Sequence, residues 1–249
     1  MAYDIHPLSF GEILDRGFRV LRDNIVLLAG IAALLFVPVG VMQMLGHSTA
    51  LSLSQLVFFL IGGPIMQAAL TVAIANVYLG SPITIDEAYI SLKPILIPYL
   101  GTFLLIYPLI ILGFVCLIIP GFYFMICWSL AAQVMIIERR FGLETMRRSR
   151  ELVRGAWWAT FGIVIAAGII SEVPTAILSV VWSYIPLFGP LLTAATRSVT
   201  VTYGAAVLVI YYFDRRCRIE DFDLRFLAEQ IRSEGGANPL PPAGVTTVA

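Results

Sequence analysis

The chain carries, between Lys93 and Glu138, a stretch with no charged residue that reads PILIPYLGTFLLIYPLIILGFVCLIIPGFYFMICWSLAAQVMII (residues 94–137). As one α-helix its 44 residues would be about 66 Å long, at about 1.5 Å per residue. The hydrocarbon core of a bilayer is only about 30 Å thick. The stretch therefore has to turn back on itself, and it predicts two membrane-spanning helices, at 95–117 and 122–137, joined by a corner.

The corner is predicted at Pro120-Gly121, since proline disrupts the helical hydrogen-bond ladder and glycine permits a turn. A ligand site at this pair is the weaker alternative. Other apolar runs of about 20 residues predict four more spans. These lie at 25–45, 56–79, 158–185 and 191–213, and Pro38 and Gly62-Gly63-Pro64 should bend the first two.

The predicted fold class is all-α: a polytopic membrane bundle of six transmembrane helices, arranged as three helical hairpins with cytoplasmic amphipathic surface helices. Residues 1–233 form a single integral membrane domain in this prediction. Residues 234–249 are rich in Gly, Pro, Ala, Thr and Val without periodicity, which predicts a disordered cytoplasmic tail.

The basic residues predict how the chain is oriented. Fifteen of the 16 Lys and Arg residues fall before the first span, between the second and third, between the fourth and fifth, or after the sixth, and the alternate connections have none. By the positive-inside rule, both termini and the loops at 80–94 and 138–156 are cytoplasmic. The hydrophobic fraction of 59% and the mean hydropathy of +0.90 agree with a membrane protein. Because all basic residues but Lys93 are arginine, we expect a GC-rich bacterial genome.

Three segments on the expected cytoplasmic side are typical of amphipathic helices. Ser9 with Glu12, and Thr84 with Glu87, match the capping box that starts a helix. In the third segment, Glu144 and Arg148 are spaced to form an i, i+4 ion pair. The first helix, at 9–23, is predicted to lie on the membrane with a single apolar stripe. That stripe consists of Phe10, Ile13, Leu14, Phe18 and Leu21.

The sequence lacks the usual signs of an enzyme. It has no phosphate-binding glycine loop, no HExxH metal pair and no GxSxG elbow. His6 and His47 lie at opposite ends of the first predicted span, so they cannot share a site. Cys116, Cys127 and Cys217 have no metal-binding spacing and are typical of packing thiols. We therefore expect no enzymatic activity, no cofactor and no bound metal.

Two charged residues lie outside the cytoplasmic stretches. Glu172 follows Trp157 by 15 residues and Arg197 precedes Tyr212 by 15 residues, so both lie about 22 Å deep in neighbouring antiparallel helices. An unpaired buried charge is costly, so we expect the two side chains within ion-pair distance. Such an intramembrane ion pair either joins the fifth helix to the sixth, forms a solute or proton site, or reflects side chains that reach the outer interface.

The connection between the fourth and fifth spans is the most basic part of the chain. Its arginines predict a cytoplasmic surface that binds anionic lipid head groups, with docking of a cytoplasmic protein as the alternative. Trp157 and Trp158 follow directly and are typical of interfacial anchors. Because the basic residues are dispersed along one membrane face, no nucleic-acid partner is expected. The predicted basic surface consists of Arg139, Arg140, Arg147, Arg148, Arg150 and Arg154.

Four motifs follow one another along the chain: LSFGEILDR at 8–16, IIPG at 118–121, Glu138 with the stretch at 147–155, and YFDRR at 212–216. In this order they resemble a family of bacterial six-helix membrane proteins, the glycerophosphoryl diester phosphodiesterase membrane-domain family. The resemblance covers roughly residues 8–230 and implies this architecture and a bacterial inner membrane. No part of the sequence matches the catalytic phosphodiesterase barrel behind the family name. The resemblance therefore implies no activity and transfers no catalytic residue.

Together these observations favour a non-enzymatic integral membrane protein that scaffolds or regulates partner proteins, or organises lipid. The alternative is a transporter or permease-like protein with Glu172 and Arg197 at a site between helices, and a membrane enzyme acting on lipid head groups comes third. The expected partners are a bilayer with anionic head groups and a membrane or cytoplasmic protein. Whether the chain forms a homo-oligomer stays open.

Overall fold

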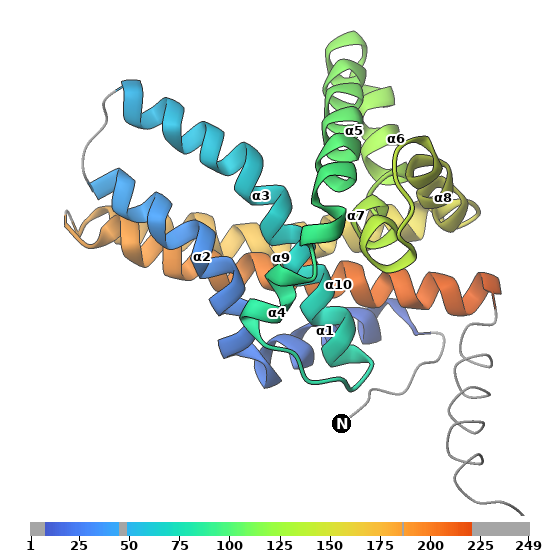
Figure 1. Cartoon of the computed structure of the whole chain (residues 1–249), viewed down its shortest axis with the longest axis horizontal. Helices are drawn as coiled ribbons and strands as arrows, with labels where there is room; N and C mark the ends of the chain where they lie inside the picture. The colour runs from blue at the N-terminus through green and yellow to red at the C-terminus, as the bar shows by residue number, and fades with distance from the viewer. Residues whose placement is uncertain (1–7, 45–48, 186, 221–249) are drawn as a thin grey trace, which may run out of the picture.

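The computed structural model describes residues 8–44, 49–185 and 187–220, and the regular elements in these ranges are helices (Figure 1). The tail predicted at 234–249, together with His6, His47, Arg225 and Arg232, lies outside the described residues. The elements are, in chain order, α1 (Phe10–Asp23), α2 (Ile25–Met44), α3 (Thr49–Tyr78), α4 (Ile85–Ile90), a 3-10 turn (Lys93–Ile95), α5 (Leu96–Cys116), α6 (Ile118–Cys127), α7 (Ala131–Gln133), a π-helical turn (Val134–Glu138), α8 (Leu143–Val153), α9 (Trp157–Ser183) and α10 (Gly189–Glu220).

Six helical segments among the described residues are long and apolar enough to cross a membrane. The all-α class with six spans is therefore confirmed, and by the length and composition of these segments the chain is a multi-pass membrane protein. The fourth segment is the least regular, since α6 ends at Cys127 and α7 and the π-turn complete it. The segments are Ile25–Met44, Gln55–Tyr78, Ile85–Cys116, Ile118–Glu138, Trp157–Ser183 and Gly189–Glu220.

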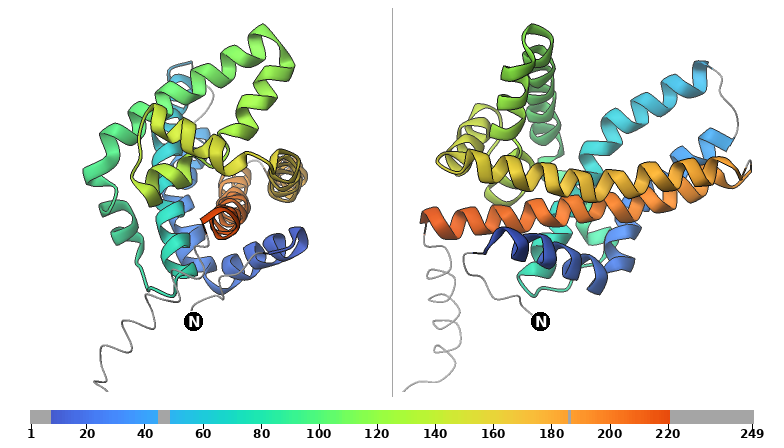
Figure 2. Two further views of the ribbon diagram at one scale, coloured as in Figure 1. Left: turned by 90° about the vertical axis from the view of Figure 1, so that its right-hand side faces the viewer. Right: turned by 180° about the vertical axis from the view of Figure 1, so that it is seen from behind.

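The long helix α10 lies at the centre of the fold. It runs antiparallel to α9, and it also packs against α2, α1 and α3. Figure 1 and the right-hand view of Figure 2 show α5 and α6 side by side as a separate arm that projects away from the α9–α10 pair. The α2–α3 arm points in another direction, where α3 diverges from α10 and α2 stays packed against it.

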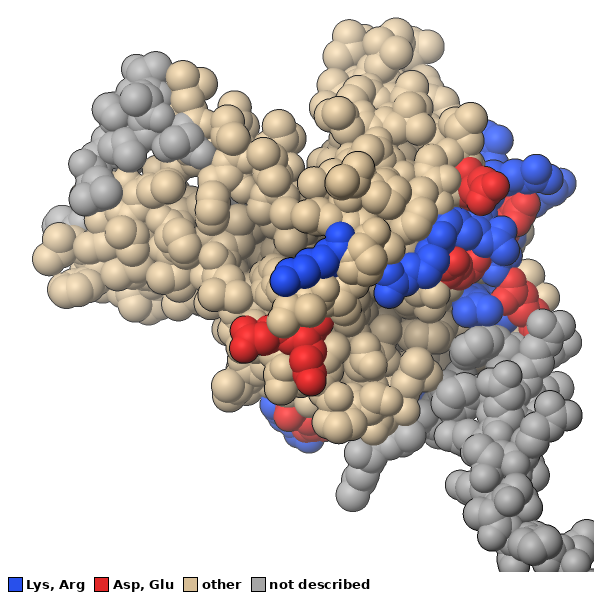
Figure 3. Space-filling model, in the orientation of Figure 1, with Lys and Arg blue, Asp and Glu red and all other residues tan. Residues whose placement is uncertain are grey.

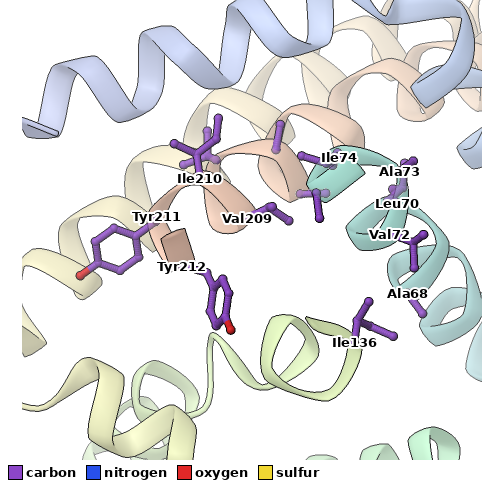
Figure 4. Close-up of a cluster of buried hydrophobic side chains, with 14 of the residues drawn as sticks. Ala68, Leu70, Val72, Ala73, Ile74, Ile136, Val209, Ile210, Tyr211 and Tyr212 are labelled. Atoms are coloured by element: carbon purple, nitrogen blue, oxygen red, sulfur yellow. The ribbon is translucent and has the colours of Figure 1, made fainter. Parts of the chain in front are cut away.

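The core lies where α3, the π-turn and α10 meet (Figure 4). Buried alanines such as Ala69, Ala73 and Ala206 let the backbones of α3 and α10 approach closely, as small residues do between membrane helices. The rings of Tyr78 and Phe213 stack across this contact with their centroids 5.5 Å apart.

The turn between α5 and α6 lies at Leu117, ahead of the predicted corner at Pro120-Gly121. Leu117 is extended, with φ −159° and ψ 135°, and α6 begins at Ile118. Pro120 therefore lies in the first turn of α6, where the missing N–H has no helical acceptor to lose. Gly121 has a packing role instead of a turning role. A Cβ atom there would overlap the ring of Phe114, so glycine lets α5 and α6 touch.

Both predicted capping boxes are confirmed. The Glu12 N–H donates to the hydroxyl of Ser9, and the Ser9 N–H donates to the Glu12 carboxylate. Thr84 and Glu87 make the same pair of bonds at the start of α4. These two short helices therefore begin where the sequence predicted.

The apolar stripe predicted for α1 is divided between a buried part and an exposed part. Ile13 and Leu21 are buried against the bundle, whereas Phe10 and Phe18 are 49% and 56% exposed. The cause is a close approach at Gly17, where a Cβ atom would lie 2.6 Å from Cγ2 of Val207 in α10. Because α1 meets α10 along the Gly17 face, Phe18 points away from the protein, whereas the half-exposed ring of Phe10 lies at the edge of the contact, against α9.

Candidate functional site

Charged side chains gather on one side of the molecule. Figure 3 shows them from the centre of the view to the bottom and the right, over α4, the 3-10 turn after it, α8 and the end of α10, while the described outer parts of the α2–α3 and α5–α6 arms show none in this view. Two clusters on this side are built around carboxylates with little exposure, those of Glu138 and Asp214.

Glu138 ends the π-turn, and its side chain is 8% exposed. Its carboxylate accepts hydrogen bonds from Nε of Arg148 at 2.9 and 3.0 Å and from the hydroxyl of Tyr212 at 2.9 Å. Nε of Arg140 lies 3.1 Å from the same carboxylate. One side chain thus joins the π-turn, α8 and α10.

Arg148 extends this network to the end of α10. Its Nη2 donates to the carboxylate of Glu220, which also accepts a bond of 2.9 Å from Nε of Arg216. Burial disfavours the charge of Arg148, but the hydrogen bonds to Glu220 and Glu138 outweigh that effect and raise the pKa of its guanidinium. Arg148 therefore turns inward to these carboxylates, instead of outward to Glu144 as the helical spacing predicted.

A cavity of about 540 Å³ opens beside these charged side chains, with Ile137 and Ile219 as its apolar wall. The two carboxylates that line it, Glu138 and Glu220, both have arginine partners. An acid or base in catalysis has to exchange its proton with a substrate, and these groups are held by protein donors. The arrangement is better suited to locking helices together than to chemistry.

Asp214 organises the second cluster, at the start of α1. Its side chain is 3% exposed and accepts the N–H of Leu8 at 2.7 Å and Nε of Arg218 at 2.9 and 3.0 Å. Nη2 of Arg218 in turn donates to the carbonyl of Leu8 at 2.6 Å. This reciprocal pair of contacts fastens the beginning of α1 to α10. Nη1 of Arg16 adds a bond of 2.9 Å to the hydroxyl of Tyr78.

Sequence reasoning missed both clusters as sites, although it quoted their residues. Leu8, Glu138, Arg148, Tyr212 and Asp214 all belong to the motifs that carry the family resemblance. The structure brings these distant motifs together around the last turns of α10, while IIPG lies apart at the α5–α6 turn. The sequence did contain a signal for both clusters. Glu138 and Asp214 each follow directly on the end of an apolar run.

The predicted basic surface divides into an exposed part and one inward side chain, Arg148. The side chain of Arg147 is 84% exposed, and that of Arg140 is 50% exposed. Trp157 stacks on Phe161 with ring centroids 5.6 Å apart, while Trp158 is 78% exposed. The exposed arginines are Arg139, Arg140, Arg147, Arg150 and Arg154, and they follow one another through the π-turn connection, α8 and the turn before α9.

The structure brings Glu172 and Arg197 together. Oε2 of Glu172 lies 3.8 Å from Nη2 of Arg197, and the side chains are 61% and 46% exposed on the surface of the isolated chain. The guanidinium also lies over the ring of Phe36, 5.8 Å from its centroid. The pair thus joins α9 to α10 and contacts α2.

Other polar groups lie along the same α9–α10 contact. The hydroxyls of Thr175 and Thr200 are 2.6 Å apart, and Nε1 of Trp182 donates to the hydroxyl of Thr196 at 3.0 Å. The buried hydroxyl of Ser171 has no hydrogen-bond partner among the described residues.

One family model matches the chain, at residues 89–214, and its description is Domain of unknown function (DUF8558). The matched range begins in α4 and ends at Asp214, so it includes Glu138, Arg148 and Tyr212. No curated protein and no solved structure matches the chain significantly.

Proposed function

This chain belongs to the DUF8558 family, and from that premise we propose a non-enzymatic scaffold or regulatory protein that organises anionic lipid at the cytoplasmic face of a bacterial inner membrane. Its six spans form three hairpins. Both termini and the loops at 80–94 and 138–156 face the cytoplasm, where α1, α4 and α8 lie on the membrane. The gathering of charged side chains on one side of the molecule (Figure 3) supports this orientation.

The resemblance to the glycerophosphoryl diester phosphodiesterase membrane-domain family supports the same architecture. Three of its four motifs meet around α10, which is what a shared structural core would require. The carboxylates in these motifs, Glu138 and Asp214, are tied to arginines and to backbone. Because protein donors already engage these carboxylates, the arrangement supports a role without catalysis.

The proposal rests on the exposed guanidinium groups of α8 and of the residue that follows it. Arg147, Arg150 and Arg154 are exposed on one short segment, next to the exposed indole of Trp158. Each basic residue near an anionic surface contributes about 1 kcal/mol of attraction. The junction at Glu138 holds this segment in place, because Arg148 fastens α8 to both the π-turn and α10.

The test compares the wild type with the triple variant Arg147→Gln, Arg150→Gln, Arg154→Gln in bilayers of phosphatidylcholine with and without phosphatidylglycerol. The wild type should unfold at a higher temperature when the anionic lipid is present. The triple variant should lose most of that increase. A matched control removes three charges elsewhere on the same expected face, as Arg19→Gln, Arg22→Gln, Lys93→Gln, and should keep most of the increase. An equal loss in both variants would overturn a role specific to α8.

A transporter remains the second candidate, and one observation favours it. Glu172 and Arg197 lie within ion-pair distance, and the neighbouring residue Ser171 has a buried hydroxyl without a partner among the described residues, so the α9–α10 contact has polar groups available to a solute. A solute that raises the unfolding temperature of the wild type, and has no effect on Glu172→Gln, would favour transport over the scaffold.

A further inference from the structure

A second cavity, of about 460 Å³, lies where the start of α1, the turn before α9 and the end of α10 meet. Its volume falls in the range of sites that bind small molecules, roughly 300–1,000 Å³. None of the exposed arginines of the basic surface lines it. Its charged and aromatic lining residues include Phe10, Trp157, Trp158, Asp214, Arg215 and Arg218.

The charges in this cavity favour an anion. Asp214 is compensated by the Leu8 N–H and by Arg218, which pairs with it at 2.9 Å. Arg215 uses only its Nε, which donates to the carbonyl of Leu152 at 2.9 Å. In the part of the chain that the structure describes, no carboxylate pairs with Arg215, so the cavity keeps one uncompensated guanidinium.

Apart from these charged groups, the cavity is lined mainly by apolar and aromatic residues. The ring of Phe10 lies against α9, where a Cβ atom at Gly162 would be 3.2 Å away from it. Trp157 and Trp158 meet edge to face with centroids 4.8 Å apart. The buried Nε1 of Trp157 has no acceptor among the described residues, and Ala156 offers no side-chain cap to the first N–H groups of α9. Arg215, Trp157 and the residues at the start of α9, which all belong to the lining of the cavity, thus have N–H groups without a side-chain acceptor in the described part of the chain.

We propose that this cavity binds the phosphate group of one anionic phospholipid, with Arg215 as the principal contact. The assignment deepens the proposed function, because it names one head group in one place in addition to the diffuse attraction of α8. A planar guanidinium recognises phosphate through two parallel N–H bonds. The exposed Phe10 and Trp158 at the rim are suited to the acyl–head-group boundary, which favours a lipid over free phosphate.

Brominated lipid gives a direct measurement, because bromine quenches tryptophan fluorescence at short range. The background is the full chain with Trp128→Phe and Trp182→Phe, so that Trp157 and Trp158 are the remaining reporters. Quenching is recorded in phosphatidylcholine bilayers against the fraction of brominated phosphatidylglycerol. The same series with brominated phosphatidylcholine measures ordinary contact with surrounding lipid.

The expected result is saturable quenching with preference for phosphatidylglycerol. Arg215→Gln should weaken that preference about tenfold, as the loss of a charge-assisted hydrogen bond does. Lys93→Gln removes an equal charge from the same expected face, outside both the cavity and the basic surface, and should keep the preference. Ala159→Leu fills the rim without changing charge and should also weaken it, which covers the case in which Arg215→Gln does not fold.

Preference unchanged in both Arg215→Gln and Ala159→Leu would overturn the site. Preference lost in the triple variant Arg147→Gln, Arg150→Gln, Arg154→Gln but kept in Arg215→Gln would overturn it as well, while supporting the basic surface as the lipid contact. Inorganic phosphate is tested separately by thermal unfolding in phosphatidylcholine. Stabilisation by phosphate equal to that by phosphatidylglycerol would overturn the assignment to a lipid.

Discussion

Oε2 of Glu138 lies 2.9 Å from Nε of Arg148, although the two residues are ten positions apart, on either side of a turn. That turn contains Arg139 and Gly142, which both have positive φ angles, of 56° and 65°. Thr102 of α5 accepts the Gly142 N–H at 2.7 Å and so holds the turn from the other side. The π-turn, the connection and α8 therefore form one unit fixed at both ends.

Breaking this pair should destabilise the protein strongly. Both side chains are at most 11% exposed, and removal of one partner from such a pair costs up to about 3 kcal/mol, because the other charge keeps only its remaining contact with Arg140 or Glu220. We expect Glu138→Gln and Arg148→Gln each to lower the unfolding temperature, and the double variant to lose less than the sum of the two.

A thiol-reactive dye can measure this unfolding, because Cys127 and Cys217 are buried and Cys116, the exposed one, can be replaced by serine. Arg147→Gln is the matched control. Its pairing with Glu151 is at the surface, with the arginine side chain 84% exposed, so its loss should have little effect. A large effect of Arg147→Gln, equal to that of Arg148→Gln, would contradict the role of the Glu138 junction.

Phe18 should matter for membrane attachment and little for the bundle itself. Its side chain is 56% exposed on the face of α1 that does not contact α10. Phe18→Glu should therefore make the segment at 9–23 more accessible to protease in vesicles, because a charge in the apolar face opposes insertion at the interface. Arg19→Glu changes the neighbouring exposed residue and should leave accessibility nearly unchanged. The idea fails if the two variants behave alike.

The expected orientation can be tested with single cysteines in a chain that lacks the native three. An impermeant reagent added outside should label Ser183→Cys and miss Asp86→Cys and Arg150→Cys, as the partition of basic residues requires. All three positions are exposed, so a missing signal would reflect the side of the membrane. Ser149 is unsuitable, because it is buried and its hydroxyl donates to the carbonyl of Cys127 at 2.9 Å. Labelling of Arg150→Cys without labelling of Ser183→Cys would show that the chain has the opposite orientation in the membrane.

The sequence allowed prediction of features that depend on near neighbours. The capping boxes at Ser9 and Thr84 involve residues three positions apart, and each span follows from about 20 consecutive residues. The contacts of Glu138 could not be predicted in this way, because Tyr212 is 74 positions away. The turn at Leu117 is accompanied by a contact between two helices, that of Gly121 with Phe114. Patterns within one helix do not record which faces of two helices meet.

Glu172 and Arg197 should show a coupling that depends on the surroundings. In water an exposed pair contributes little, whereas an isolated charge in a bilayer is unfavourable. In bilayers we expect Glu172→Gln and Arg197→Gln each to cost about 1–2 kcal/mol, with the double variant well below their sum. Reconstituted protein and the dye assay provide the measurement. Strict additivity of the two substitutions would show that the pair has no energetic role.

Gly121 should be sensitive to the smallest enlargement. A methyl group there would overlap the ring of Phe114, and a Cβ atom at Gly113 would lie 3.1 Å from Cα of Gly121, so the two backbones leave no space between them. Overpacking of this kind costs about 1–3 kcal/mol. Gly121→Ala should therefore open the α5–α6 arm and raise the reactivity of Cys127, at the end of α6. Gly101→Ala is the control in the same arm, since its Cβ would meet no atom within 4 Å. Alanine favours a helix over glycine by about 1 kcal/mol, so the control should keep or gain stability. Equal losses in the two variants would show that helix propensity or general strain, and not the contact with Phe114, requires glycine at this position.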